Sequence, residues 1–116
     1  MKKTIAIDFD GIISKYDGFK GLTVYGKPIM ENVDYIKELY MNGYNLVLFT
    51  TRLNPELNNS RDNKISYYSL KHYLEDININ KCFTFLTGCK PLADLYLDDR
   101  AVNNIHDLEL IIKKLK

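Results

Sequence analysis

Two aspartates and a glycine follow the first apolar segment of the chain, at Asp8, Asp10 and Gly11. Carboxylates this close repel each other, and burial at the end of a strand raises the cost of keeping both ionised. A divalent cation removes that cost, and carboxylate oxygens suit a hard ion such as Mg²⁺. The alternative is an ordinary turn with two surface acids, since Asp and Gly are common turn residues. The rest of the chain has to distinguish a metal site from a turn.

Apolar runs rich in β-branched residues predict four strands, and apolar residues at helical spacing predict three helices between and after them. The strands are expected at residues 3–9, 45–49, 82–86 and 93–97, and the helices at residues 31–42, 60–77 and 104–115. Strands that alternate with helices indicate an α/β fold, here a three-layer, Rossmann-like parallel sheet with helices on both faces. A length of 116 residues suits a single domain. Residues 12–30 are rich in glycine and predict a flap with at most a small hairpin.

The helical pattern also predicts which side chains turn inward and where helices begin and end. Gly43 is placed to end the first helix, and Ser60 or Asp62 to cap the second. The residues expected to be buried or partly buried are Val33, Ile36, Leu39 and Tyr40 in the first helix and Ile65, Tyr68, Leu70 and Tyr73 in the second.

Ligands of open parallel sheets bind beyond the carboxyl ends of the strands. Polar side chains follow each predicted strand, in chain order Asp8 and Asp10, Thr50 and Arg52, Lys90, and Asp98 with Asp99. Such a set is rarely produced by four unrelated turns, so it favours a site over the turn interpretation.

These residue types suit the transfer of a phosphoryl group from an ester to a carboxylate and then to water. We expect Asp8 to attack phosphorus and carry the aspartyl-phosphate, which divides one difficult step into two. Asp10 is the expected general acid and base. The Thr50 hydroxyl, the Lys90 ammonium and backbone N–H groups from Phe9 to Gly11 are expected to hold the phosphoryl oxygens.

A Mg²⁺ ion is expected between the carboxylates of Asp8 and Asp98 and a main-chain carbonyl near Asp10, with Asp99 orienting its shell through water. The ion would screen the negative nucleophile from the negative phosphate. Arg52 has two alternatives, a contact with a second anionic group of the substrate or an ion pair with a surface acid.

The chain resembles the haloacid dehalogenase (HAD) superfamily of phosphotransferases, whose four motifs occur in order across residues 5–99. The matching segments are Asp8-Phe9-Asp10-Gly11-Ile12, Leu46 to Phe49 followed by Thr50, Lys90 within Gly88-Cys89-Lys90-Pro91, and Leu95-Tyr96-Leu97-Asp98-Asp99. Ile12 departs from the usual Thr or Val. The short interval between the lysine and the acidic pair is similar to that of deoxyribonucleotidases.

The resemblance implies a HAD-like hydrolase that lacks a cap domain, because the intervals 12–30 and 51–89 hold only a flap and a helix with its loops. Capless members act on larger substrates or use another subunit as a lid, so a homo-oligomer is expected. Tyr16, Phe19 and Tyr25 of the flap are candidates for a substrate lid or a subunit contact. Lys64 and Lys71 are alternatives to Lys90, but both fall on a helix expected to face solvent.

The expected function is therefore a Mg²⁺-dependent phosphatase acting on a nucleotide, a sugar phosphate or a larger phosphorylated molecule. One alternative is a non-catalytic module that keeps the fold for binding or assembly. A receiver-type phospho-acceptor domain is disfavoured, because the predicted third strand ends in Leu86-Thr87-Gly88 without an acid. A dehalogenase is disfavoured because such enzymes need neither Asp10 nor a metal.

Composition limits the partners. The net charge of +1 and the absence of a basic run argue against a nucleic-acid polymer. Asp8 interrupts the first apolar run far short of a secretory or membrane-spanning segment, so neither a leader nor a membrane is expected. The two cysteines, Cys82 and Cys89, form no disulfide framework or metal motif and are expected to be reduced, as in a cytoplasmic protein.

Overall fold

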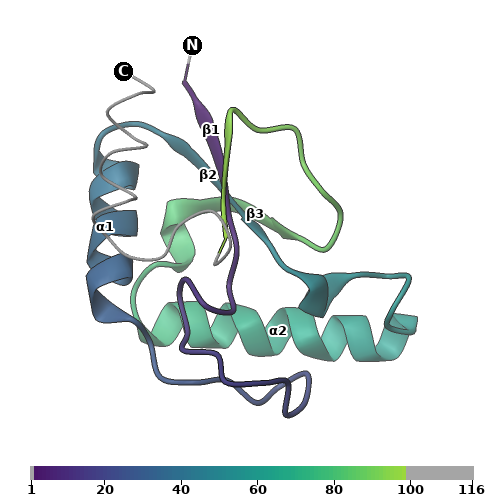
Figure 1. The fold of residues 1–116 in the computed structure, drawn as a ribbon. Coiled ribbons are helices and arrows are strands. Elements are labelled where there is room, and N and C mark those ends of the chain that lie inside the picture. Colours follow the sequence, from purple (N-terminus) through teal and green to yellow (C-terminus); the bar gives the residue numbers. More distant parts are fainter. Residues whose placement is uncertain (1, 99–116) are drawn as a thin grey trace.

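Four parallel strands form one sheet in the order β3-β2-β1-β4, flanked by helices (Figure 1). The structure, a computed structural model, describes residues 2–98. The predicted α/β, Rossmann-like architecture is confirmed within this range. The helix predicted over residues 104–115 lies outside the described residues.

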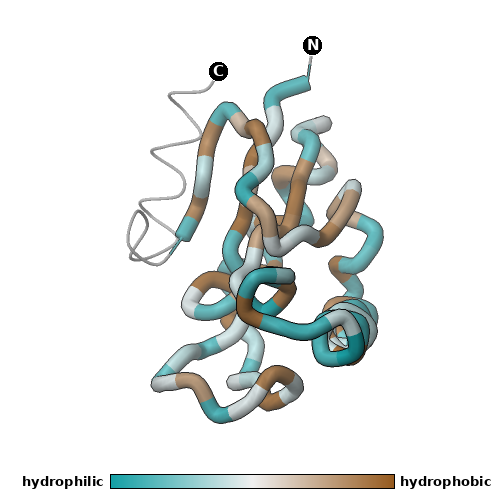
Figure 2. Tube along the Cα trace, turned by 90° about the vertical axis from the view of Figure 1, so that its right-hand side faces the viewer, coloured by the Kyte–Doolittle hydropathy of each residue, from teal (hydrophilic) through white to brown (hydrophobic). Residues whose placement is uncertain are grey.

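The observed elements fall close to the predicted ranges. The strands are β1 (Thr4–Ile7), β2 (Asn45–Phe49), β3 (Phe83–Thr87) and β4 (Leu95–Leu97), the helices are α1 (Met30–Met41) and α2 (Ser60–Asp76), and two 3₁₀ turns are η1 (Thr51–Leu53) and η2 (Asn80–Cys82). Each of β1 and β2 contributes three consecutive buried residues, as expected for central parallel strands covered on both faces. Figure 2 shows hydrophobic residues along the strands at the centre of the trace and also in some of the outer loops. None of the described helices is long and apolar enough to cross a membrane.

Helix α1 buries a narrower stripe than the pattern predicted. Val33, Ile36 and Leu39 are buried, whereas Tyr40 is 46% exposed. Tyr40 follows Leu39 by one helical step of 100°, which turns it toward the edge of the packed face. Gly43 lies just beyond the helix with a φ of +88°, the left-handed conformation that glycine adopts at little cost.

Helix α2 begins at a different cap from the one predicted. Asn59 is the N-cap, and its Oδ1 accepts a hydrogen bond of 2.8 Å from the backbone N–H of Asp62, so the assignment to Ser60 or Asp62 was wrong. The buried residues of the helix, Ser66, Leu70 and Leu74, are four apart, and Tyr73 is half-buried beside them. Ile65 and Tyr68 are 46% and 58% exposed, so their predicted partial burial was wrong.

The flap, residues 12–29, contains no strand and passes alongside α2 (Figure 1). Its two ends are joined by backbone hydrogen bonds from Lys15 N–H to Lys27 O and from Ile29 N–H to Ile13 O. Its returning half is tied to α2, where the Tyr25 hydroxyl donates to Ser69 Oγ at 2.7 Å. The glycine-rich segment is therefore fastened at its base and, two residues before Lys27, to α2.

Three aromatic rings pack the flap and α2 against the segment that follows β1. Phe9, Tyr25 and Tyr73 contact one another edge to face, with all three pairs of ring centroids 5.2 Å apart. Phe9 is fully buried at the centre of this cluster. The Tyr73 hydroxyl donates to Gly26 O at 2.9 Å. The residue between the two predicted catalytic aspartates is thus an anchor of the fold.

Because of Tyr73, the free energy of unfolding depends on pH in the alkaline range. Burial, with a smaller contribution from the Asp10 carboxylate, raises the pKa of Tyr73 from 10.0 to about 12. The folded protein therefore keeps this proton between pH 10 and 12, where the unfolded chain loses it. The stability contributed by neutral Tyr73 is complete below pH 10 and is lost as pH rises through 12.

We expect Tyr73→Phe to be about 1 kcal/mol less stable than the wild type near neutral pH, because the hydrogen bond to Gly26 is lost. This difference should stay constant from pH 7 to 9 and shrink between pH 10 and 12. The measurement is urea unfolding followed by circular dichroism across that range. Curves that remain parallel up to pH 12 would contradict the assignment.

Candidate active site at the carboxyl edge of the sheet

The ends of β1 and β4 bring two carboxylates side by side. Ile7 pairs with Leu97 in the parallel ladder, and the backbone N–H of Asp8 donates to Leu97 O at 2.9 Å. This register places Asp8 next to Asp98. In the strand order β3-β2-β1-β4, the chain leaves β1 toward β2 on one side, while β4 lies on the other. The two acids therefore stand at the point where the strand order reverses, which is where open α/β sheets bind ligands.

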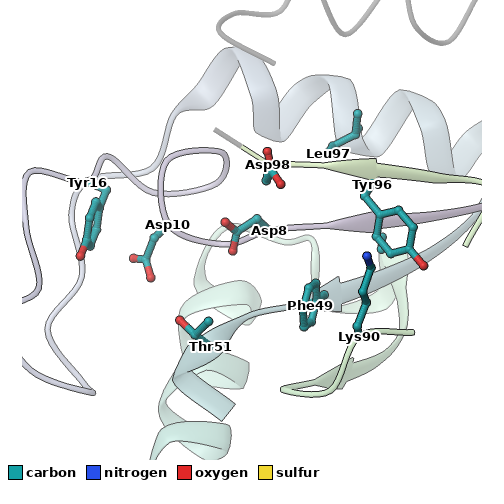
Figure 3. Close-up of a pocket in the computed structure, with 10 residues that line it drawn as sticks. Asp8, Asp10, Tyr16, Phe49, Thr51, Lys90, Tyr96, Leu97 and Asp98 are labelled. Atoms are coloured by element: carbon teal, nitrogen blue, oxygen red, sulfur yellow. The ribbon is translucent and has the colours of Figure 1, made fainter. Parts of the chain in front are cut away.

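A cavity of about 470 Å³ opens at this edge. Its lining combines acids, one lysine, one threonine and apolar side chains, namely Ala6, Asp8, Asp10, Tyr16, Phe49, Thr51, Lys90, Tyr96, Leu97 and Asp98. Figure 3 shows the Asp8 and Asp98 side chains close together, with Asp10 farther along the loop that follows β1 and Lys90 across the cavity. The structure therefore gathers four of the predicted site residues around one space.

Lys90 reaches the cavity from the loop between β3 and β4, with its Nζ 4.9 Å from the centre of the Tyr96 ring. This loop starts at Gly88, which crosses the backbone of η1 closely. A Cβ at Gly88 would lie 2.1 Å from the carbonyl carbon and oxygen of Leu53, so the crossing accepts only glycine. Lys64 and Lys71 lie on α2 outside the cavity, which favours Lys90 among the three lysines.

Arg52 makes an ion pair with Asp10 in the interior. Its Nε donates to Asp10 Oδ2 at 2.8 Å and one Nη donates to Oδ1 at 3.0 Å, a bidentate arrangement. The side chains of Arg52 and Asp10 are 3% and 18% exposed. The remaining guanidinium protons go to main-chain carbonyls of the flap, those of Gly21, Leu22 and Val24, at 2.8–3.1 Å.

All five guanidinium N–H groups of Arg52 are therefore used within the protein. The predicted contact between Arg52 and a second anion of the substrate does not fit this geometry. Arg52 does form an ion pair, but its partner is Asp10, whose side chain is only 18% exposed, and not a surface acid as the alternative had it. The same pair occupies both oxygens of the Asp10 carboxylate. Each of these oxygens keeps a second lone pair, so a metal contact through Asp10, by its side chain or its main-chain carbonyl, stays a prediction.

After β2, the threonine that lines the cavity is Thr51 and not the predicted Thr50. Thr50 is 1% exposed, and its Oγ1 accepts a hydrogen bond from the backbone N–H of Arg52, so it caps η1 behind the cavity wall. Thr51, the next residue along the chain, lines the cavity. The hydroxyl available to a ligand is therefore that of Thr51, because the 3₁₀ turn rotates the next residue outward.

Two of the backbone donors after Asp8, those of Phe9 and Gly11, are also engaged. Phe9 N–H donates to Asp8 Oδ1 at 2.7 Å and so orients the carboxylate itself. Gly11 N–H donates to Ser14 O at 2.8 Å, which contradicts its predicted role in binding phosphate. Gly11 has a φ of +86°, so glycine is needed here to turn the chain back after Asp10.

The carboxylates at this edge provide oxygen donors for a divalent cation. Within residues 2–98, no group of three or more His, Cys, Asp or Glu side chains is arranged to hold a metal ion. Two carboxylates from adjacent strand ends, Asp8 and Asp98, nevertheless fit Mg²⁺, which commonly takes one or two carboxylates together with water and substrate phosphate. Asp99, the predicted outer-shell residue, lies outside the described residues.

Besides Thr51 and the aliphatic residues Ala6 and Leu97, two aromatic cavity residues were not assigned to the site from the sequence, Phe49 and Tyr96. Both belong to strands and were counted only as sheet residues, although Phe49 is the last residue of β2 and borders the carboxyl edge. The two cysteines are free, with Cys82 buried and Cys89 exposed, so no disulfide crosses this part of the chain. Burial raises the pKa of the Cys82 thiol, which keeps it in the unreactive protonated form.

The sequence matches no family model and no curated protein. Among solved structures, the chain is similar to a conserved protein coded by a locus from Bacteroides thetaiotaomicron, with a TM-score of 0.62 and 22% sequence identity. The similarity covers 100% of this chain and 93% of that protein. At this identity the likeness supports the fold, and the chemistry of the site has to be argued from its residues.

Proposed function

We propose that this protein is a Mg²⁺-dependent phosphomonoester hydrolase that works through a phosphorylated Asp8. The observation that carries the proposal is the cavity at the carboxyl edge, where Asp8 and Asp98 lie together opposite Lys90 and beside the fixed carboxylate of Asp10. Two adjacent acids, a cation and a positioned third acid meet the requirements of phosphoryl transfer from an ester.

Asp8 is the nucleophile in this proposal. Its carboxylate is held by Phe9 N–H through Oδ1, so the orientation of the attacking group is set before substrate binds. Attack by a carboxylate oxygen forms the bond to phosphorus as the ester P–O bond breaks. To serve as the acid, Asp10 must first take up a proton and give up one of its two hydrogen bonds with Arg52. The leaving oxygen then takes that proton, which releases the alcohol and leaves Asp10 as the carboxylate paired with Arg52.

Hydrolysis of the aspartyl-phosphate uses the same residues in reverse. Asp10 takes a proton from water as the water oxygen attacks phosphorus, and the bond to Asp8 breaks to free inorganic phosphate. This proton returns Asp10 to its protonated form for the next cycle. Lys90 and the Thr51 hydroxyl lie where they can bind the other phosphoryl oxygens. Mg²⁺, held by Asp8 and Asp98, would offset the negative charge of nucleophile and phosphate.

The test is phosphate release from a panel of phosphomonoesters, comprising a nucleotide, a sugar phosphate and an aryl phosphate. We expect release with Mg²⁺ and its loss in EDTA, with recovery when excess Mg²⁺ is restored. Circular dichroism before and after chelation checks that the fold is unchanged. A folded protein that releases no phosphate from any compound would contradict the proposal.

A further inference from the structure

A second cavity of about 390 Å³ adjoins the candidate active site. It is called the side pocket here, and its lining residues are Asp10, Tyr16, Phe19, Leu22, Thr51, Arg52, Leu57 and Asn58. Three of them, Asp10, Tyr16 and Thr51, also line the main cavity. In Figure 3 the Tyr16 ring lies beyond Asp10, on the side away from Asp98. The side pocket therefore continues the site past Asp10.

The charged groups and the amide donors of the side pocket are already used within the protein. Both Asp10 oxygens accept from Arg52, and all five Arg52 donors are used. The Asn58 side-chain amide donates to Arg52 O at 2.9 Å and to Asn63 Oδ1 at 3.1 Å, which uses both of its protons. The pocket thus offers no free cation to a second phosphate or carboxylate of a ligand.

The apolar groups of the side pocket are open instead. Tyr16, Phe19 and Leu57 are 47%, 61% and 71% exposed, although each is large and hydrophobic. Phe19 lies over the Arg52 guanidinium, whose carbon is 5.5 Å from the ring centre, and this cation–π contact positions the ring. Large apolar side chains gathered at a cavity commonly mark a ligand surface.

From these observations we propose that the side pocket binds the leaving group of the substrate and selects an uncharged, apolar group that carries an aromatic ring. The proposal rests on the proposed function, in which Asp10 protonates the leaving oxygen. In that step the leaving oxygen lies next to Asp10. The group attached to it then extends past Asp10 into the side pocket. A cavity of about 150 Å³ accepts benzene, so the side pocket has room for one or two rings.

The test compares two substrates whose leaving alcohols have similar basicity, ethyl phosphate and 2-(1-naphthyl)ethyl phosphate. The wild type should use the naphthyl compound with at least about tenfold higher kcat/KM, because burying the rings adds binding energy. The variant Phe19→Ser/Leu57→Ser should bring the ratio of the two kcat/KM values close to one. Both residues are largely exposed, so the fold should tolerate the change.

Met41→Ser is the matched control, since Met41 is 80% exposed at the end of α1, away from the cavities, and should keep both kcat/KM values. Equal use of both substrates by the wild type would overturn the side-pocket assignment while leaving the phosphatase proposal intact. If neither compound is hydrolysed, calorimetry with the naphthyl compound tests the side pocket by itself, and the phosphatase proposal fails only if the panel of phosphomonoesters also releases no phosphate. Binding weakened about tenfold in the double variant would support the side-pocket assignment, and absent or unchanged binding would overturn it.

Discussion

Replacing Asp8 with asparagine should lower Mg²⁺-dependent phosphate release by at least about 10³-fold while leaving the fold intact. Asparagine keeps the oxygen that accepts the Phe9 N–H, so the backbone turn after β1 retains its hydrogen bond. The amide oxygen is a poor nucleophile and carries no charge for a cation. The measurement is steady-state phosphate release with the substrate that the panel identifies as the best.

Asp94→Asn provides a matched control for this result. Asp94 lies at the opposite, amino edge of the same two strands, where its Oδ2 accepts the Thr4 N–H at 2.7 Å. The control makes the same chemical change next to β1 and β4 without touching the cavity lining. We expect its activity to stay within about twofold of the wild type. Retention of activity in Asp8→Asn would show that another residue is the nucleophile.

Replacing Arg52 with methionine should destabilise the protein by about 3 kcal/mol, near the lower end of the range for breaking a buried ion pair, since Asp10 keeps some exposure to water. The change leaves the Asp10 carboxylate without its cation and three flap carbonyls without their donors. Activity should fall as well, by about tenfold or more, because the direction of Asp10 is no longer fixed. Urea unfolding and kcat are the two measurements.

Arg52→Lys separates charge from geometry. Lysine keeps the positive charge but has three donors on one nitrogen, so it cannot serve both Asp10 and the flap. We expect intermediate stability with a kcat still well below the wild type. Arg61→Met, at an exposed position in the first turn of α2, is the control for loss of an arginine and should change stability by less than about 0.5 kcal/mol. Wild-type stability in Arg52→Met would contradict the structural role.

The fold and the gathering of the acids were predictable because both depend on short-range patterns. Continuous apolar runs such as Leu46 to Phe49 distinguish central parallel strands from other elements. Once the strands are known to be parallel, their carboxyl ends must share one edge. Asp8, Asp98 and Lys90 follow from that rule without knowledge of any side-chain contact.

The roles of Arg52 and Thr50 were less predictable, because they depend on where the flap lies. An arginine after a strand end looks available to a ligand until the carbonyls of Gly21, Leu22 and Val24 are placed around it. Thr50 and Thr51 differ only in the turn that follows β2, and one 3₁₀ step decides which of them faces the cavity. Similarly, the spacing of apolar residues in α2 does not report how wide a face the sheet covers, so Ile65 and Tyr68 were misplaced.

The pairing of β1 with β4 has a consequence for how the protein folds. Thr4 and Asp94, which hydrogen bond at the start of these strands, are 90 residues apart in the chain. Closing so long a loop is entropically costly, and parallel pairing at this separation is slow to form. Asp8 and Asp98 are therefore brought together only by the most distant contact in the sheet. A cation that binds both would favour the closed chain by mass action, by about 2.7 kcal/mol at one hundred times its dissociation constant, so that filling the site and completing the fold would be linked equilibria.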